Sequence, residues 1–187
     1  MATSIKQLEA ILDDIGWKYK SNPGEDGNGY LYSGFPTKVY KDLDGDNYAA
    51  VLFSVQENGE LIKFIVPKLY NCVDRNNRKA FFEVAIRKSY EKKLCFYDYD
   101  HRDGEIRMIV DFPLEDASLT KKQVQRVVKA LITLIDANDP DIRAAIDEGK
   151  LPLIDYKSDL THEISKMNSD QQLELLVDIK RRNQSVK

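Results

Sequence analysis

The chain has 187 residues, of which 42% are hydrophobic and 32% charged, and it carries a net charge of −3. The 28 basic residues nearly balance the 31 acidic ones, which argues against a general nucleic-acid binder, because such proteins normally show a basic excess or a basic face. The sequence contains no run of about 18 apolar residues, so it predicts no membrane span. The first ten residues also lack the apolar segment of a secretory signal. We therefore expect a cytoplasmic protein without membrane contact.

The first quarter of the chain predicts one helix and one short strand. Residues 4–15 carry apolar side chains at helical spacing, namely Ile5, Leu8, Ile11, Leu12 and Ile15. Thr3 or Ser4 can cap this helix, and Gly16 can end it. Residues 17–20 alternate like a strand, and the turn-forming residues 21–29 predict a mobile loop. The stretch 30–40 is ambiguous, because its aromatics suggest a strand whereas Gly34 and Pro36 would confine it to an edge or break it.

Two hairpins enclose a helix in the middle of the chain. The apolar runs 49–56 and 60–66 flank Asn58 and Gly59, the pair best suited to a type I′ turn. We expect Pro67 to end the second strand and residues 75–91 to form a helix. Residues 94–100 and 105–112 then form a second hairpin. Its last strand places Ile106, Met108, Val110 and Phe112 on one face, although Ile109 breaks the alternation.

The last third of the chain predicts helices only. Thr120 and Gln123 form a capping-box signature, and it opens a helix with an apolar stripe made of Val124, Val127, Val128, Leu131, Leu134 and Ile135. Asp139 and Pro140 suit the N-cap and first position of a separate short helix that ends at Gly149. Residues 150–168 look irregular, and residues 169–182 predict a final helix.

These elements follow the order α-β-β-β-α-β-β-α. Strands joined by hairpins form an antiparallel sheet, and we expect the helices to pack mainly on one face of it. The predicted fold class is therefore α+β.

Two acidic turns are candidates for a metal site. Asp42, Asp44 and Asp46 surround Gly45, as in a calcium loop, but the sixth and twelfth positions counted from Asp42 hold no glycine and no glutamate. A tight turn before a strand is the favoured interpretation. The cluster of Asp98, Asp100 and Asp103 is interpreted in the same way.

No combination of residues predicts catalysis or a cofactor. Cys72 and Cys95 are expected to be reduced thiols, and His101 and His162 lie in predicted loops without zinc-ligand spacing. Cys95 and His101 are the conceivable nucleophile pair, but they would lie at opposite ends of one strand, about 20 Å apart. Phosphate-binding loops and the GxSxG nucleophile motif are absent from the sequence. We therefore expect no enzyme, no cofactor and no metal.

The helix predicted over residues 75–91 is apolar on two sides. Phe82, Ile86 and Tyr90 follow one line at four-residue spacing, and Phe81 with residues 84–85 marks another. Such a helix is either deeply buried or shared with a second chain. A homodimer through this helix is one hypothesis.

Residues 52–69, the helix that follows, and residues 97–136 together resemble the YbjN-domain proteins, which are small bacterial proteins often described as sensory-transduction regulators. The most telling segments are residues 98–107 and the link 113–116 into the Thr120-capped helix. The family is similar in fold to type III secretion chaperones. The resemblance implies a YbjN-like domain over residues 1–149, with residues 150–187 as a helical extension. It also implies a non-enzymatic, often dimeric protein that binds other polypeptides.

The leading hypothesis for function is therefore a chaperone-like or regulatory module that captures a partner polypeptide. The candidate binding or dimer-interface residues are Phe81, Phe82, Ile86 and Tyr90 on the helix, and Tyr32 and Phe35 in the aromatic stretch that begins at Tyr30. One alternative is a metal- or small-ligand-binding domain that uses the turns around Asp44 or Asp100. Another is a structural subunit of a complex.

Overall fold

The computed structural model describes residues 3–22, 29–91, 94–152, 161 and 163–184. The chain divides into two compact units, Met1–Pro152 and Leu153–Lys187. The boundary expected between residues 149 and 150 stays a prediction. The strand predicted over residues 17–20 is displaced, because the first strand spans Lys20–Asn22 and takes in the first two residues of the predicted loop 21–29. Most of the rest of that loop falls outside the described residues. Within the stretch 150–168 that was expected to be irregular, residues 163–166 are helical.

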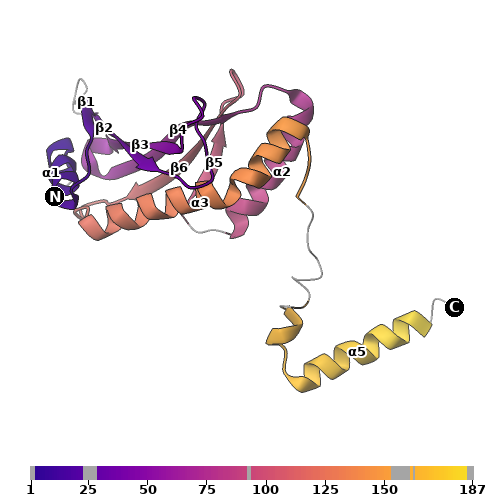
Figure 1. Cartoon of the computed structure of the whole chain (residues 1–187). Coiled ribbons are helices and arrows are strands. Elements are labelled where there is room, and N and C mark those ends of the chain that lie inside the picture. The colour runs from indigo at the N-terminus through magenta and orange to yellow at the C-terminus, as the bar shows by residue number, and fades with distance from the viewer. Residues whose placement is uncertain (1–2, 23–28, 92–93, 153–160, 162, 185–187) are drawn as a thin grey trace. The chain divides into compact units, whose positions relative to one another are not determined.

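Within the residues that the structure describes, the first unit contains three α-helices and six strands (Figure 1). In chain order the elements are α1 (Ile5–Ile15), β1 (Lys20–Asn22), β2 (Tyr30–Pro36), β3 (Tyr48–Gln56), a 3-10 turn (Glu57–Gly59), β4 (Leu61–Asn71), α2 (Arg75–Glu91), β5 (Phe96–Tyr99), β6 (Glu105–Pro113) and α3 (Lys121–Glu148). The second unit contains α5 (Ser169–Gln184). None of the helices in the described residues is long and apolar enough to cross a membrane.

The six strands form one antiparallel sheet in the order β1-β2-β3-β4-β6-β5. Alternate side chains of the central strands are fully buried, and Figure 1 shows α1, α2 and α3 gathered on the same side of the sheet. The core lies between the sheet and these helices, and its largest fully buried side chains include Phe53, Phe64, Phe81, Met108 and Leu131. The predicted α+β class and one-sided helix packing are confirmed.

The ambiguous stretch after residue 29 forms a full strand, so four strands precede α2 where three were expected. Pro36 lies at the last position of β2, where a missing N–H costs little. Gly34 lies beneath the Tyr48 ring, and a Cβ at this glycine would come within 1.7 Å of the Tyr48 hydroxyl oxygen. The glycine therefore lets an aromatic ring of β3 cross β2 and does not break the strand.

The helix ends follow the predicted caps. Ser4 caps α1 through a capping box with Gln7, and Gly16 ends the helix at a φ of 83°. Thr3, the other candidate, is buried instead, and its hydroxyl oxygen accepts a hydrogen bond from the Leu119 amide at 3.2 Å. Thr120 and Gln123 form the predicted capping box of α3.

The prediction of a separate helix starting at Asp139 is wrong. Pro140 lies inside the single helix α3, which changes direction in its second half (Figure 1) and ends at Gly149. Proline offers no N–H to the carbonyl of Asp136, and such a loss normally kinks a helix. The buried stripe continues past the proline through Ile142, Ala145 and Ile146, and the burial of these side chains offsets the lost hydrogen bond.

The prediction that Pro67 ends the second strand of the first hairpin is also wrong. β4 continues to Asn71 through a bulge between Val66 and Tyr70, where three residues of β4 face one residue of β6. A bulge tolerates proline because the extra residues leave the hydrogen-bond ladder. Lys68 adopts a φ of 49° there, and its amide donates to the Glu105 carboxylate at 3.0 Å.

The connection between β3 and β4 differs in detail from the predicted two-residue turn. Gln56 pairs with Leu61, so the loop contains four residues, and Glu57 has a positive φ in addition to Asn58 and Gly59. The hairpin itself is confirmed. The two strands stay paired only as far as Leu52 and Ile65, and beyond this point β3 pairs with β2 alone among the described strands.

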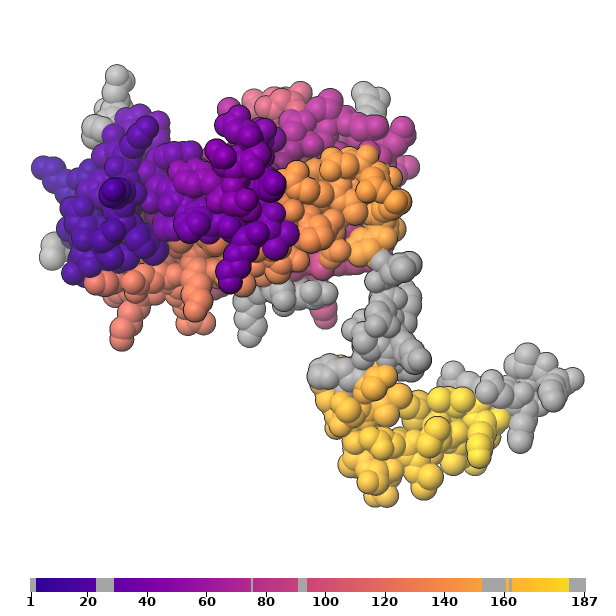
Figure 2. Space-filling view, in the orientation of Figure 1, coloured from indigo at the N-terminus to yellow at the C-terminus, as the bar shows by residue number. Residues whose placement is uncertain are grey.

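The loop between β2 and β3 is fastened to α3. The Asp136 carboxylate accepts hydrogen bonds from the backbone amides of Lys38, Val39 and Tyr40, at 2.9–3.0 Å. Burial raises the pKa of Asp136, but these three hydrogen bonds outweigh that effect and hold the pKa below its ordinary value. Figure 2 shows the purple segment that follows β2 lying against the orange part of α3.

Candidate functional site

Helix α2 separates the two apolar lines that the sequence predicts on it. Phe81 and the adjoining Val84 and Ala85 are buried, and they belong to the core. On the other line, Phe82 is 39% exposed, Ile86 70% and Tyr90 93%. The line of Phe82, Ile86 and Tyr90 is therefore the one that can contact a partner.

A pocket of about 190 Å³ lies between α2 and β5. We call it the edge pocket, and it is lined by Phe81, Phe82, Ala85, Ile86, Ser89, Tyr97 and Tyr99. The Phe82 and Tyr99 rings meet edge to face with centroids 5.1 Å apart, and Phe81 contacts both tyrosine rings with centroids 6.2 Å away. Edge-to-face contacts of this kind hold aromatic rings in fixed orientations.

Both tyrosine hydroxyls of the edge pocket are bound within the fold. The Tyr97 oxygen accepts a hydrogen bond from the Asn138 side-chain amide at 3.1 Å, and the Tyr99 hydroxyl donates to the Cys72 carbonyl at 3.1 Å. Burial raises the pKa of Tyr97, so its phenol is neutral at physiological pH. Apart from the Ser89 side chain, the pocket consequently offers ring surfaces and aliphatic groups to a ligand.

The edge pocket lies beside an open edge of the sheet. β5 is the last strand in the sheet order, and among the described strands it pairs only with β6. An edge strand presents unpaired backbone N–H and C=O groups, which can pair with another extended chain. The arrangement can therefore bind an extended segment through backbone hydrogen bonds and receive one of its side chains in the pocket.

The aromatic stretch is divided between the core and the open face of the sheet. Phe35 is buried, and its ring meets Trp17 edge to face at 4.8 Å. Tyr30 and Tyr32 lie on the face opposite the helices and are 38% and 36% exposed. Of the two predicted site residues in this stretch, only Tyr32 reaches the surface.

Tyr32 begins a row of cross-strand neighbours on the open face. Consecutive register pairs join five residues from β2 to β5, namely Tyr32, Leu52, Ile65, Ile109 and Phe96. Ile109, which breaks the alternation of its strand, is buried on this face because Ile65 and Phe96 are its neighbours. Sequence patterning shows the exception at Ile109, but it does not show the row.

The acidic turns are closed by their own hydrogen bonds. One oxygen of Asp42 accepts the amides of Asp44 and Asp46, at 3.0 and 2.9 Å. In the other turn, hydrogen bonds from the side chain and amide of Arg102 hold the pKa of Asp100 well below its usual range. Among the described residues, no group of three or more His, Cys, Asp or Glu side chains could hold a metal ion.

The two cysteines are free thiols and both are buried. Burial raises the pKa of Cys95 to about 11. At neutral pH its thiolate fraction is therefore small, and the thiolate is the nucleophilic form. His101 lies in the exposed turn after β5, and His162 lies outside the described residues.

One buried polar cluster has no counterpart in the sequence-based predictions. The Asp139 carboxylate accepts hydrogen bonds from the Tyr70 hydroxyl and from Arg143, both at 3.0 Å. The Arg143 guanidinium also lies 5.7 Å from the centroid of the Tyr40 ring and 5.5 Å from that of the Tyr70 ring. The i,i+4 spacing of Asp139 and Arg143 is visible in the sequence, but it fits a helix that starts at Asp139 as well as a continuous one.

No protein-family model and no curated protein matches the sequence. Among solved structures, the chain is similar to the crystal structure of YbjN from E. coli, which is described as a candidate transcription regulator. The TM-score is 0.51, and the match covers 75% of this chain and 94% of that chain at 11% sequence identity. The chain therefore has a YbjN-like fold, as the sequence resemblance predicts.

Proposed function

We propose that this protein is a non-enzymatic binding module, chaperone-like or regulatory, that captures an extended segment of a partner polypeptide at β5 and the edge pocket. The observation that carries the proposal is the combination of an open strand edge with the exposed apolar line of α2. Backbone pairing would supply affinity, and the aromatic pocket would select a side chain, as in other complexes formed by strand addition. The YbjN-like fold, seen in a protein described as a candidate regulator, supports a binding role.

The exposed apolar side chains of α2 are explained better by a binding surface for a polypeptide than by the ordinary exposure of single apolar residues. Ile86 and Tyr90 are four residues apart on one line of the helix, and Phe82 extends that line into the edge pocket. A row of large apolar side chains in water is unfavourable unless a partner removes it from solvent. A second copy of the chain could supply the segment, which would make the protein a homodimer.

The test compares exposed aromatic residues on two surfaces. Phe82→Asp alters the edge pocket, whereas Tyr30→Asp alters an equally exposed aromatic on the open face of the sheet. Affinity purification from the native host should recover the same stoichiometric partner with wild type and Tyr30→Asp and lose it with Phe82→Asp. Hydrogen exchange of the β5 amides should slow when the purified partner is added.

Two results would contradict the proposal. One is recovery of the same partner by Phe82→Asp, and the other is unchanged exchange of the β5 amides in the complex. Sedimentation velocity of the same variants tests whether the partner is a second copy of the chain. A dimer in wild type that becomes a monomer in Phe82→Asp would identify the partner as another copy of this chain.

A further inference from the structure

A second pocket opens where β4 leaves β3. Pairing of these strands ends at Leu52 and Ile65, and the bulge that begins after Val66 carries β4 away. The resulting cavity of about 180 Å³ is here called the split pocket. It is lined by Tyr32, Tyr40, Asp42, Leu43, Asp44, Tyr48, Ala50, Val66, Pro67 and Lys68.

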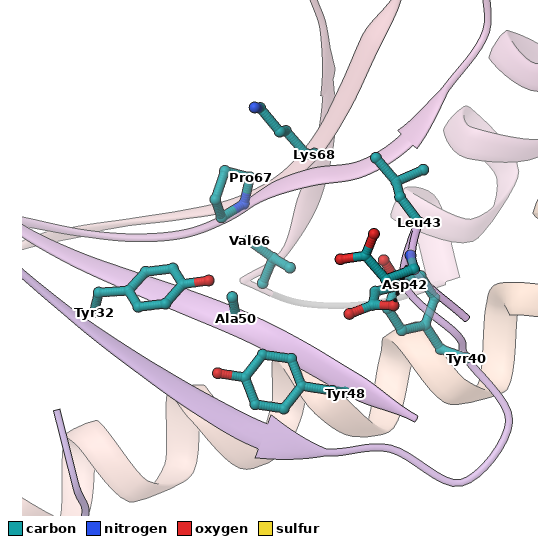
Figure 3. Close-up of a pocket in the computed structure, with 10 residues that line it drawn as sticks. Tyr32, Tyr40, Asp42, Leu43, Tyr48, Ala50, Val66, Pro67 and Lys68 are labelled. Atoms are coloured by element: carbon teal, nitrogen blue, oxygen red, sulfur yellow. Dashed lines mark hydrogen bonds between the residues drawn. The ribbon is translucent and has the colours of Figure 1, made fainter. Parts of the chain in front are cut away.

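The polar groups of the split pocket converge. Figure 3 shows the hydroxyls of Tyr32 and Tyr48 and the carboxylate of Asp42 directed toward the same space, beside the small side chain of Ala50. The Lys68 ammonium is directed away from Tyr48 and Asp42 (Figure 3). The pocket therefore combines phenol oxygens, carboxylates and an apolar floor.

Several of these groups retain hydrogen-bonding capacity. Among the described residues, no hydrogen bond engages the hydroxyls of Tyr32 and Tyr48 or the carboxylate of Asp44. Asp42 uses only Oδ1 for the amides of its own turn. Burial, followed by the neighbouring Tyr48 and Asp42, raises the pKa of Tyr32, so its phenol stays neutral at physiological pH.

The chemistry of these walls selects the class of ligand. Two carboxylates disfavour an anion, and neutral phenols with a turn-bound aspartate are poor ligands for a hard metal ion, which requires six or more oxygen donors. An ammonium or guanidinium group can interact with the carboxylates, hydrogen bond to the phenol oxygens and lie against the aromatic rings. A cavity of about 180 Å³ suits such a head group with a short aliphatic stem.

We propose that the split pocket binds an organic cation, namely an ammonium or guanidinium group. The group is either part of a free small molecule or the end of a lysine or arginine side chain on a polypeptide. The site is on the open face of the sheet, whereas the edge pocket lies on the helix side. It therefore does not depend on partner capture at β5.

The test titrates the full-length protein with choline and with agmatine, and follows amide chemical shifts by NMR. Both cations should give saturable shifts in residues 41–48 and around Tyr32. The uncharged isostere 3,3-dimethyl-1-butanol has the shape of choline and should bind at least about tenfold more weakly, because it lacks the charge.

Matched variants locate the site. Asp44→Asn should weaken choline binding about three- to tenfold, whereas Asp46→Asn, in the same turn but outside the pocket lining, should leave it unchanged. Tyr48→Ala should weaken it about tenfold, and Tyr30→Ala should not. Gly34→Ala keeps every polar group of the pocket but displaces the Tyr48 ring, so it should also weaken binding. Thermal melts verify that each variant is folded.

The source of the cation is decided by comparing agmatine with a capped Gly-Arg-Gly peptide. Tighter binding of the peptide assigns the pocket to a side chain of a polypeptide, and tighter binding of agmatine assigns it to a free small molecule. Equal binding of choline and its neutral isostere would overturn the proposal. Equal loss in Asp44→Asn and Asp46→Asn, or no saturable shift below about 10 mM ligand, would do the same.

Discussion

The edge pocket and the split pocket are similar in size, and both are lined by tyrosine, but they offer a ligand opposite chemistry. In the edge pocket the hydroxyls of Tyr97 and Tyr99 are bound by Asn138 and Cys72, so the rings present apolar surface. In the split pocket, by contrast, the hydroxyls of Tyr32 and Tyr48 face the cavity (Figure 3).

This difference shows that the hydrogen-bond partner of a tyrosine hydroxyl determines the role of that tyrosine in a pocket. A hydroxyl that is bound within the fold turns the residue into an aromatic wall, and a hydroxyl directed at a cavity makes it a hydrogen-bonding group for a ligand. Composition alone does not distinguish the two roles. Four pairs of substitutions test the comparison, and they are given from the largest expected effect to the smallest.

The largest effect is expected within the edge pocket itself. Phe81→Ala removes a ring that is almost fully buried and should lower the free energy of unfolding by about 3–5 kcal/mol. Phe82→Ala removes a partly exposed ring and should cost about 1 kcal/mol. Urea unfolding of both variants measures the difference. Equal losses of unfolding free energy in the two variants would show that Phe81 and Phe82 contribute alike to the core.

Removal of the Asp139 carboxylate should destabilise the cluster of Tyr70, Asp139 and Arg143. This cluster packs against Tyr40, which lines the split pocket. Asp139→Ala leaves the buried Tyr70 hydroxyl without its acceptor and removes the ion-pair partner of Arg143, at a cost of about 2 kcal/mol. The cost stays below that of a fully buried pair because Arg143 is 39% exposed and also donates to the Lys41 carbonyl.

Asp141→Ala is the control, because it removes a more exposed carboxylate of α3, which pairs with Lys88 of α2, and should cost less than about 1 kcal/mol. Thermal unfolding of both compares them. A similar cost would mean that the buried cluster contributes no more than a surface pair.

Asp136→Asn should destabilise the loop of the split pocket in a pH-dependent way. Replacing the carboxylate weakens three hydrogen bonds from residues 38–40 and should cost about 1–2 kcal/mol at neutral pH. Because the pKa of Asp136 is lowered in the folded state, its contribution is present above the unfolded-state pKa of about 4 and is lost as pH falls through the folded-state pKa.

The stability curves of wild type and Asp136→Asn should therefore converge below about pH 4. Chemical unfolding at several pH values measures this convergence. Asp111→Asn, which removes an exposed partner of Lys63, serves as the control and should show a smaller difference at neutral pH. A pH-independent gap between wild type and Asp136→Asn would contradict the proposed role of the carboxylate.

The smallest effect distinguishes the two kinds of tyrosine directly. Tyr99→Phe removes a hydroxyl that donates to the Cys72 carbonyl and should cost about 1 kcal/mol. Tyr32→Phe removes a hydroxyl without a hydrogen bond among the described residues, so stability should stay within about 0.5 kcal/mol. Guanidinium unfolding resolves the two outcomes. A larger loss of stability in Tyr32→Phe than in Tyr99→Phe would contradict the difference drawn between the two pockets.

The sequence predicts the parts of the fold that depend on local pattern. Apolar runs around Asn58 and Gly59 mark the first hairpin, and period-2 alternation marks the last strand of the second. The caps at Ser4 and Thr120 mark two helix starts, because none of these signals requires distant residues. Pro67 and Pro140 are misjudged for a common reason. Their local cost is known, but the bulge and the buried stripe that accommodate them depend on residues elsewhere in the fold.

The candidate sites are predictable to different degrees. The two-sided pattern of residues 75–91 points to half of the edge pocket, since Phe82 and Ile86 are spaced along one helix. The split pocket joins Tyr32, Asp42 and Tyr48 from two strands and a loop, and their meeting depends on the bulge of β4 and on the anchor at Asp136. The local signals are the acidic turn around Asp44 and Gly34 within an aromatic strand, and neither shows that these residues meet.

The bend of α3 connects these two pockets. Within one turn of the helix, Asp136 holds the loop of the split pocket, Asn138 holds Tyr97 of the edge pocket, and Asp139 holds Arg143 against the Tyr40 ring. An effect of a ligand in one pocket on the affinity of the other pocket would be transmitted through this turn of α3. By thermodynamic reciprocity, the second ligand must then change the affinity of the first by the same factor.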